Sequence, residues 1–164
     1  MRIVFIDNSG WQYTVETPYE RPLGGSQSAL CYLAAELAQL GHSITILNGS
    51  ATASESRGVK IANFSALLEL LADVDVGVVL NRSIAHMLRR DLRVSIPLVL
   101  WNQHAPNQSD IQELRGLRER KNWNAFAFVS DWQRHHFARI FWIPAEKVGL
   151  CETPCRRLSP NVPI

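Results

Sequence analysis

The chain has 164 residues, a formal net charge of +2 at pH 7, 46% hydrophobic residues and 20% charged residues. These values are typical of one globular domain and exclude a disordered chain, and the small net charge argues against a nucleic-acid partner. No apolar run is long enough to span a bilayer, and the first residues lack the pattern of a signal peptide. Because the three cysteines predict no disulfide framework, we expect a cytoplasmic protein.

Strands and helices alternate along the sequence. Short apolar runs predict strands at Arg2–Asp7, Ser43–Asn48, Val59–Phe64, Val74–Leu80, Pro97–Trp101 and Ala125–Val129. Helical patterns predict helices at Ser26–Leu40, Ser65–Leu71, Ser83–Leu92, Ser109–Arg120 and Asp131–Phe141. Apolar runs without strict alternation suit strands that are covered on both faces. We therefore predict an α/β fold, a Rossmann-like open parallel sheet with helices on both faces.

One connection is unusually long. Asn8–Leu23 joins the first strand to the first helix and carries Trp11, Tyr13 and Tyr19. Long ordered loops in compact domains are more often functional than idle. The aromatic rings could stack on a sugar or pack into the core, and the sequence leaves both readings open.

Ligands of open α/β sheets bind beyond the carboxyl ends of the strands. The candidate cleft residues at these turns are Gly24, Gly25, Ser26, Asn81, Arg82 and Ser130, with His104 as the candidate catalytic residue. A glycine pair lets the backbone approach a ligand, and a helix start favours an anion such as phosphate. The alternative is a plain turn with Ser26 as the helix N-cap. His104 could move a proton or donate to a developing oxyanion, or it could simply pack within its loop.

Other motifs exclude common cofactors. The glycine pair belongs neither to a Gly-x-Gly-x-x-Gly fingerprint nor to a P-loop, so neither NAD nor ATP is predicted. Cys151 and Cys155 lack a second ligand pair, and the adjacent His135 and His136 point apart on a helix, so no metal is predicted. Two basic runs, Leu88–Arg93 and Arg115–Lys121, fit solvated helix faces or contact with a membrane surface or partner.

Five segments share their order and spacing with one enzyme family. They are Pro22–Ala29, Leu33–Ile46, Leu98–His104, Phe128–Gln133 and Phe141–Val148. The first holds a Gly-Gly-Ser turn, and the second ends a helix in Leu-Ala and places Gly-His before a strand. From Met1 to about Val148, the chain resembles the N-terminal domain of family 4 glycosyltransferases.

The resemblance implies one half of a GT-B fold, in which two Rossmann-like domains face each other across a cleft. These enzymes transfer a sugar from a nucleotide diphosphate donor to an acceptor, usually with retention and without a metal. The N-terminal domain mainly supplies the acceptor side. By this resemblance, Gly24 and Gly25 would approach the donor diphosphate and sugar. His104 would contact the donor sugar near the reacting carbon, and Ser130 would line the cleft.

The chain also departs from the family. Gln27 stands where the family often has Glu, and Asn81 stands where it often has His. Residues 1–148 fit the N-terminal domain, residues 149–164 are an atypical tail, and the C-terminal nucleotide-sugar domain is absent. Read in a shifted frame, residues 151–159 can spell Arg-Asn-Ala-Met-Ser-Pro-Ala-Phe, which is the family's linker. Our hypothesis is that the reading frame slips near Val148.

Three functions remain open at this stage. The first is the acceptor-side domain of a sugar transferase, inactive without its nucleotide-binding half. The second is a stand-alone Rossmann-like module that binds an anion or a partner, including a second copy through the exposed interdomain face. The third is a different α/β enzyme that uses His104 with Asp7 or Asp131.

Overall fold

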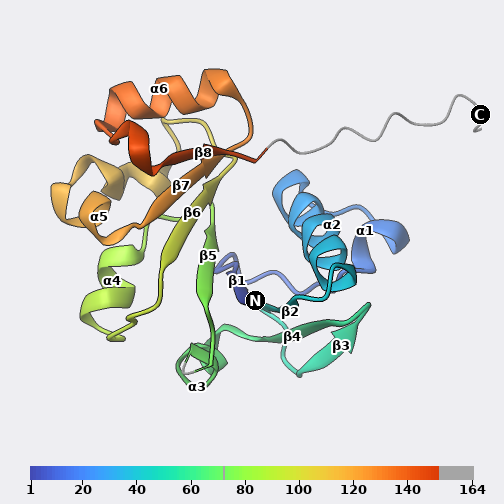
Figure 1. Cartoon of the computed structure of the whole chain (residues 1–164). Helices are drawn as coiled ribbons and strands as arrows, with labels where there is room; N and C mark the ends of the chain where they lie inside the picture. The colour runs from blue at the N-terminus through green and yellow to red at the C-terminus, as the bar shows by residue number, and fades with distance from the viewer. Residues whose placement is uncertain (72, 152–164) are drawn as a thin grey trace, which may run out of the picture.

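The computed structural model describes residues 1–71 and 73–151, and these form one eight-stranded sheet (Figure 1). The strands are β1 (Arg2–Ile6), β2 (Ser43–Asn48), β3 (Ser54–Ser56), β4 (Val59–Asn63), β5 (Val76–Leu80), β6 (Leu98–Asn102), β7 (Ala125–Phe128) and β8 (Val148–Leu150). Their order is β3-β4-β2-β1-β5-β6-β7-β8, and β3 alone pairs antiparallel. The predicted α/β fold with a mostly parallel sheet is confirmed.

Helices flank the sheet on both faces. They are α1 (Thr17–Glu20), α2 (Gly25–Gln39), α3 (Leu67–Leu71), α4 (Ala85–Arg90), α5 (Leu117–Asn122) and α6 (Asp131–Phe141), with 3-10 turns η1 (Phe64–Ala66), η2 (Ser109–Arg115) and η3 (Ala145–Lys147). In the described part of the chain, none of these helices is both long and apolar enough to cross a membrane.

Strands β1, β2, β4, β5, β6 and β7 each contribute side chains to two separate cores. Along β1, Val4 and Ile6 pack in the core that α3 to α6 cover, whereas Phe5 packs in the core beneath α2. Tyr13 joins the α2 core, so the long loop after β1 covers part of that face. Because both faces of the central strands are buried, their sequences read as continuous apolar runs.

The predicted helix Ser109–Arg120 is wrong as a single element. The 3-10 turn η2 ends at Arg115, and α5 starts at Leu117 after Gly116 adopts an extended conformation (φ −77°, ψ 130°). The Arg120 guanidinium donates to the carbonyl oxygens of Leu114 and Arg115, both at 2.7 Å. These bonds satisfy the carbonyl groups that a continuous helix would have paired.

The last described strand reaches past the predicted domain boundary. Gly149 and Leu150, which the sequence places in the tail, pair with Ala127 and Phe128 of β7. The Cys151 amide extends this pairing with a 2.7 Å bond to the Phe128 carbonyl oxygen. Residues 152–164, including Cys155 and most of the proposed out-of-frame tail, lie outside the described residues.

A buried carboxylate holds the helix layer together. The N-cap residue of α4, Ile84, makes no side-chain hydrogen bond to the start of this helix. Instead Glu119 of α5, only 5% exposed, accepts bonds from the backbone amides of Ala85 and His86, both at 2.8 Å. The same carboxylate accepts a 2.9 Å bond from the Trp123 indole. Glu119 therefore joins α4 to α5 and completes the hydrogen bonding of three donors.

We expect the Glu119→Ala variant to lose about 3 kcal/mol of unfolding free energy, because its buried N–H donors lose a charged acceptor. Urea unfolding followed by circular dichroism measures this loss. The matched control is Glu113→Ala, an exposed residue of η2, which should change the same free energy by less than about 0.5 kcal/mol. Equal losses in both variants would show that Glu119 does not cap α4.

Candidate functional site

The carboxyl ends of β1, β5 and β6 open into one polar pocket of about 240 Å³. Parallel strands bring these ends to the same edge of the sheet. The polar side chains that line the pocket include Asp7, Gln27, Asn81, Arg82, His104 and Asp110. The structure thus brings together three of the residues predicted from the sequence, Asn81, Arg82 and His104.

Asp7 is a buried carboxylate at the end of β1. Its Oδ2 accepts a 2.7 Å bond from the Tyr13 hydroxyl and a 3.1 Å bond from Gln27 Nε2, and its Oδ1 accepts a 3.0 Å bond from the Ser9 amide. Burial, reinforced by the Asp7 charge, raises the pKa of Tyr13 far above its usual range, so Tyr13 remains a donor. These three donors satisfy the oxygens of the buried Asp7 carboxyl group.

Asn81 joins three segments at the end of β5. Its Nδ2 donates to Ser26 Oγ at 2.8 Å, and its Oδ1 accepts from the Gln103 amide at 2.6 Å. Its backbone is left-handed (φ 56°), a conformation that asparagine tolerates better than most residues. Ser26 is not the N-cap of α2, because Gly24 occupies that position. Ser26 instead links the first turn of α2 to the strand ends.

The end of β6 carries several buried polar atoms without partners. Trp101 Nε1, Asn102 Oδ1, Gln103 Nε2 and His104 Nδ1 have no hydrogen-bond partner within the described residues. The loop itself is held firmly, since the His104 carbonyl oxygen accepts 2.9 Å bonds from Asn102 Nδ2 and Gln133 Nε2. Of these four residues, only His104 lines the polar pocket, so its Nδ1 is the unpaired atom that a polar ligand in the pocket can satisfy.

Arg82 places a cation at the rim of the pocket. Its Nη1 donates to the Asn8 carbonyl oxygen at 2.7 Å, and its Nη2 lies 3.5 Å from Asp110 Oδ1. Both side chains of this ion pair are partly exposed, so water screens their attraction. The pocket therefore offers a guanidinium, carboxylates and amides, a mixture that suits hydroxyl groups or a phosphate.

The two glycines that open α2 have different surroundings. A Cβ on Gly24 would lie 2.6 Å from Gln27 Oε1 and 2.9 Å from Trp11 Cζ3, so this glycine makes room for the Trp11 ring. A Cβ on Gly25 would meet no described atom within 4 Å. Packing against Trp11 and Gln27 thus explains why residue 24 is a glycine, whereas Gly25 leaves the start of α2 open to a ligand.

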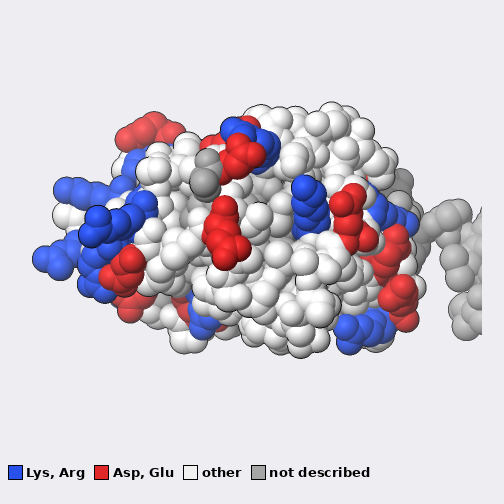
Figure 2. Space-filling view, turned by 90° about the horizontal axis from the view of Figure 1, so that it is seen from below, with Lys and Arg blue, Asp and Glu red and all other residues white. Residues whose placement is uncertain are grey.

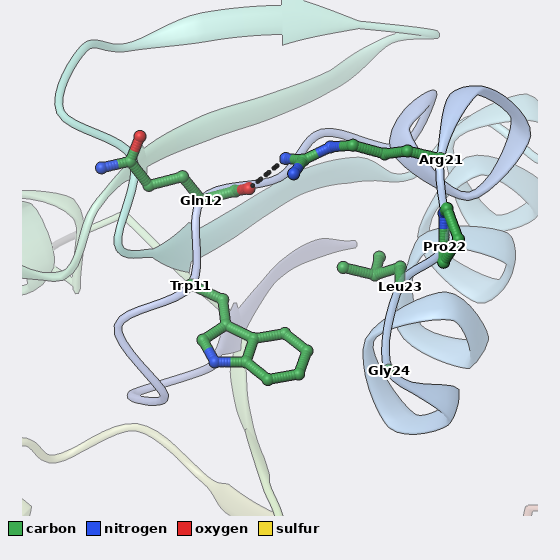
Figure 3. A pocket seen from close by; sticks show the side chains of 6 residues that line it. All are labelled: Trp11, Gln12, Arg21, Pro22, Leu23 and Gly24. Atoms are coloured by element: carbon green, nitrogen blue, oxygen red, sulfur yellow. Dashed lines mark hydrogen bonds between the residues drawn. The ribbon is translucent and has the colours of Figure 1, made fainter.

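Trp11 and Gly24 also line a second pocket, of about 550 Å³ (Figure 3). The Trp11 side chain is 49% exposed and extends toward Leu23 and Gly24, and Arg21 donates a 3.0 Å bond to the Gln12 carbonyl oxygen. Gly49 allows this arrangement, because a Cβ there would lie 2.1 Å from the backbone of Gly10. Of the loop's aromatic residues, Tyr13 packs in the core, while Trp11 presents its ring to this pocket.

Ser130 lies outside the residues that line either pocket. Its hydroxyl caps α6 by accepting a 3.2 Å bond from the Gln133 amide. Asp131 is exposed and pairs with Arg134 at 2.6 Å. Gln27 and Asp110 are pocket residues that the sequence analysis did not select, because neither directly follows a predicted strand.

In the part of the chain that the structure describes, no three His, Cys, Asp or Glu side chains are grouped so that they could hold a metal ion. Protein-family models and curated proteins were compared with this chain, and none of them matches it. The case for a function therefore rests on the pocket residues and the sequence pattern.

Cys31 lies beneath this site as a buried thiol of α2 that contacts the Thr14 carbonyl oxygen at 3.4 Å. Burial, and to a smaller extent the Asp7 charge, raises the pKa of Cys31 from 9.0 to about 12. The thiol is therefore protonated at neutral pH and cannot serve as a nucleophile.

Exchanging either glycine for alanine tests the packing at the start of α2. In the Gly24→Ala variant the new methyl group displaces the Trp11 ring, so the NMR signal of the Trp11 indole N–H should shift. Gly25→Ala, the matched control, should leave this signal unchanged because its Cβ has open space. Identical spectra for the two variants would contradict the contact between Trp11 and Gly24.

The raised pKa of Cys31 predicts that the free energy of unfolding falls as the pH rises from about 9 toward about 12. In this range the unfolded chain releases the thiol proton while the folded chain retains it, which favours unfolding. Urea unfolding at several pH values should show a steeper fall for the wild type than for Cys31→Ala. Parallel curves for the two proteins would contradict the prediction.

Proposed function

We propose that the described residues form the acceptor-side half of a two-domain sugar transferase of the GT-B type, related to family 4 glycosyltransferases. The polar pocket supports this proposal, because it lies at the strand ends where the resemblance expects the cleft. Its volume equals that of roughly eight water molecules, which suits a sugar ring or phosphate better than a whole nucleotide.

The observation that carries the proposal is the polar lining of the pocket, which the unpaired His104 Nδ1 shares with Asn81 and Arg82. A sugar presents hydroxyl groups that both donate and accept hydrogen bonds. Such a ligand can satisfy the unpaired His104 Nδ1 and also bind the amide and guanidinium groups of Asn81 and Arg82 in the same pocket. An apolar ligand would leave these polar groups without partners at a cost in affinity.

In the proposed reaction, the bond between the donor sugar and its diphosphate breaks, a bond from the sugar to an acceptor hydroxyl oxygen forms, and the proton of that hydroxyl passes to the departing diphosphate. His104 contacts the transferred sugar from the pocket, where its loop is anchored by Asn102 and Gln133. The start of α2 has no side-chain cap, so its backbone N–H groups face the developing diphosphate charge near Gly25. The Trp11 ring supplies a flat apolar face on which an acceptor sugar stacks.

A second candidate is a single-domain module that binds an anion. The open space at Gly25 and the Arg82 guanidinium favour it, since together they offer N–H donors and a positive charge. The third idea, a one-domain enzyme, finds less support: Asp131 pairs with Arg134 on α6, and both Asp7 oxygens already accept hydrogen bonds.

NMR titration of the isotopically labelled chain separates these candidates. With methyl α-glucoside or methyl α-mannoside as the probe, we expect shifts centred on Trp11, Asn81 and His104. UDP-glucose and GDP-mannose should bind no more tightly than the simple glycosides, because the other half of the cleft holds the nucleotide. The His104→Ala variant should weaken glycoside binding, whereas Asn124→Ala, at the opposite ends of the strands, serves as the control.

Each alternative has its own signature in this experiment. Shifts at Gly25 and Arg82 caused by inorganic phosphate, without any response to the glycosides, would favour the anion-binding module. Micromolar affinity for a nucleotide sugar would contradict the proposed division between the two halves. Turnover by this chain alone that His104→Ala abolishes would instead support a one-domain enzyme.

A further inference from the structure

The helix layer carries a basic groove far from the candidate cleft. It has a volume of about 360 Å³ and is lined by His86, Arg89, Arg90, Arg118, Lys121 and Asn122. Among the residues that the structure describes, no acidic side chain lines it, although the whole chain has a net charge of only +2. Figure 2 shows Lys and Arg side chains gathered at this end of the molecule, over α4 and α5. The positive charge is thus concentrated rather than spread evenly.

The cations in this groove have different roles. Arg89 donates to the carbonyl oxygens of Val94 and Ile96, at 2.7 and 2.8 Å, and so closes the turn after α4. Arg90 pairs with Asp91 at 2.6 Å. Arg118 and Lys121 are exposed, and three residues apart on α5 they share one face. These two cations are therefore the ones that remain available to an external anion.

Large apolar side chains lie exposed beside these cations. Leu117, 56% exposed, shares a face of α5 with Lys121. Trp142, 76% exposed, ends α6 and lies next to α5, with the Arg120 guanidinium 6.0 Å from its ring. Arginine and lysine flanked by an exposed tryptophan and leucine are typical of protein surfaces at the membrane–water interface. A soluble phosphate would make no use of the apolar groups.

We propose that the α4–α5 groove, with Leu117 and Trp142, binds the surface of a membrane that contains anionic phospholipids. Arg118 and Lys121 attract the negatively charged headgroups, because the groove's lining within the described residues is basic or neutral. Trp142 and Leu117 enter the boundary between headgroups and acyl chains. This contact is peripheral and reversible, and it does not depend on the proposed transferase function, because it uses no residue of the candidate cleft.

Cosedimentation of the full chain with vesicles tests this proposal. We expect binding to vesicles of phosphatidylglycerol and phosphatidylcholine, little binding to phosphatidylcholine alone, and weaker binding at high salt. Removing both charges in Arg118→Ala/Lys121→Ala should weaken binding roughly 25-fold, at about fivefold per cation. Both side chains are exposed, so the double variant should retain the circular dichroism spectrum of the wild type.

The matched control is Arg57→Ala/Lys60→Ala, which removes the same charge from exposed positions at and beside β4. It should bind anionic vesicles within about twofold of the wild type. Equal losses of vesicle binding in the two double variants would show that only the net charge of the protein matters, and would overturn the proposal.

A second variant distinguishes binding to a lipid surface from binding to other polyanions. Trp142→Ala should weaken vesicle binding but leave binding to heparin or single-stranded RNA unchanged, since only a bilayer offers an apolar region. Binding to RNA or heparin without binding to anionic vesicles would overturn the proposal. So would displacement from vesicles by millimolar inorganic phosphate at constant ionic strength, because that result indicates a pocket for a free anion.

Discussion

The first turn of α2 is fastened to the carboxyl ends of the strands by two side-chain hydrogen bonds. Gln27 donates to Asp7 after β1, and Asn81 after β5 donates to Ser26. Asn81 also accepts from the Gln103 amide, so the same residue fixes the loop after β6. The positions of α2, the polar pocket and the His104 loop therefore depend on one small network. Because its members are largely buried, each lost bond leaves a costly unpaired group.

Two pockets lie near this network. Asp7, Gln27 and Asn81 of the network line the polar pocket together with Arg82 and His104, and the larger pocket lies beside Trp11. Gly24 allows Trp11 to approach α2, and Gly25 keeps the adjacent helix start open. A polar pocket and an exposed aromatic ring therefore lie on either side of the first turn of α2.

At the other end of the molecule, one buried carboxylate rather than a network of several side chains joins the elements. There the helices α4 and α5 are joined by the buried Glu119, whose carboxylate faces inward to backbone amides. The surrounding cations face outward, so the acid that stabilises the layer does not line the groove above it. The buried carboxylate that stabilises the two helices and the exposed cations that can bind an anion therefore lie on different sides of α5.

The sequence alone determined the parallel sheet, because buried strands and crossover helices have local patterns, and it selected Asn81, Arg82 and His104 by their places after strands. Short edge strands such as β8 have too few residues for such a pattern. The tertiary structure decided that Ser26 meets Asn81, that Trp11 covers Gly24 and that Glu119 caps α4. These contacts join residues far apart in the chain, and they form only when packing brings the segments together.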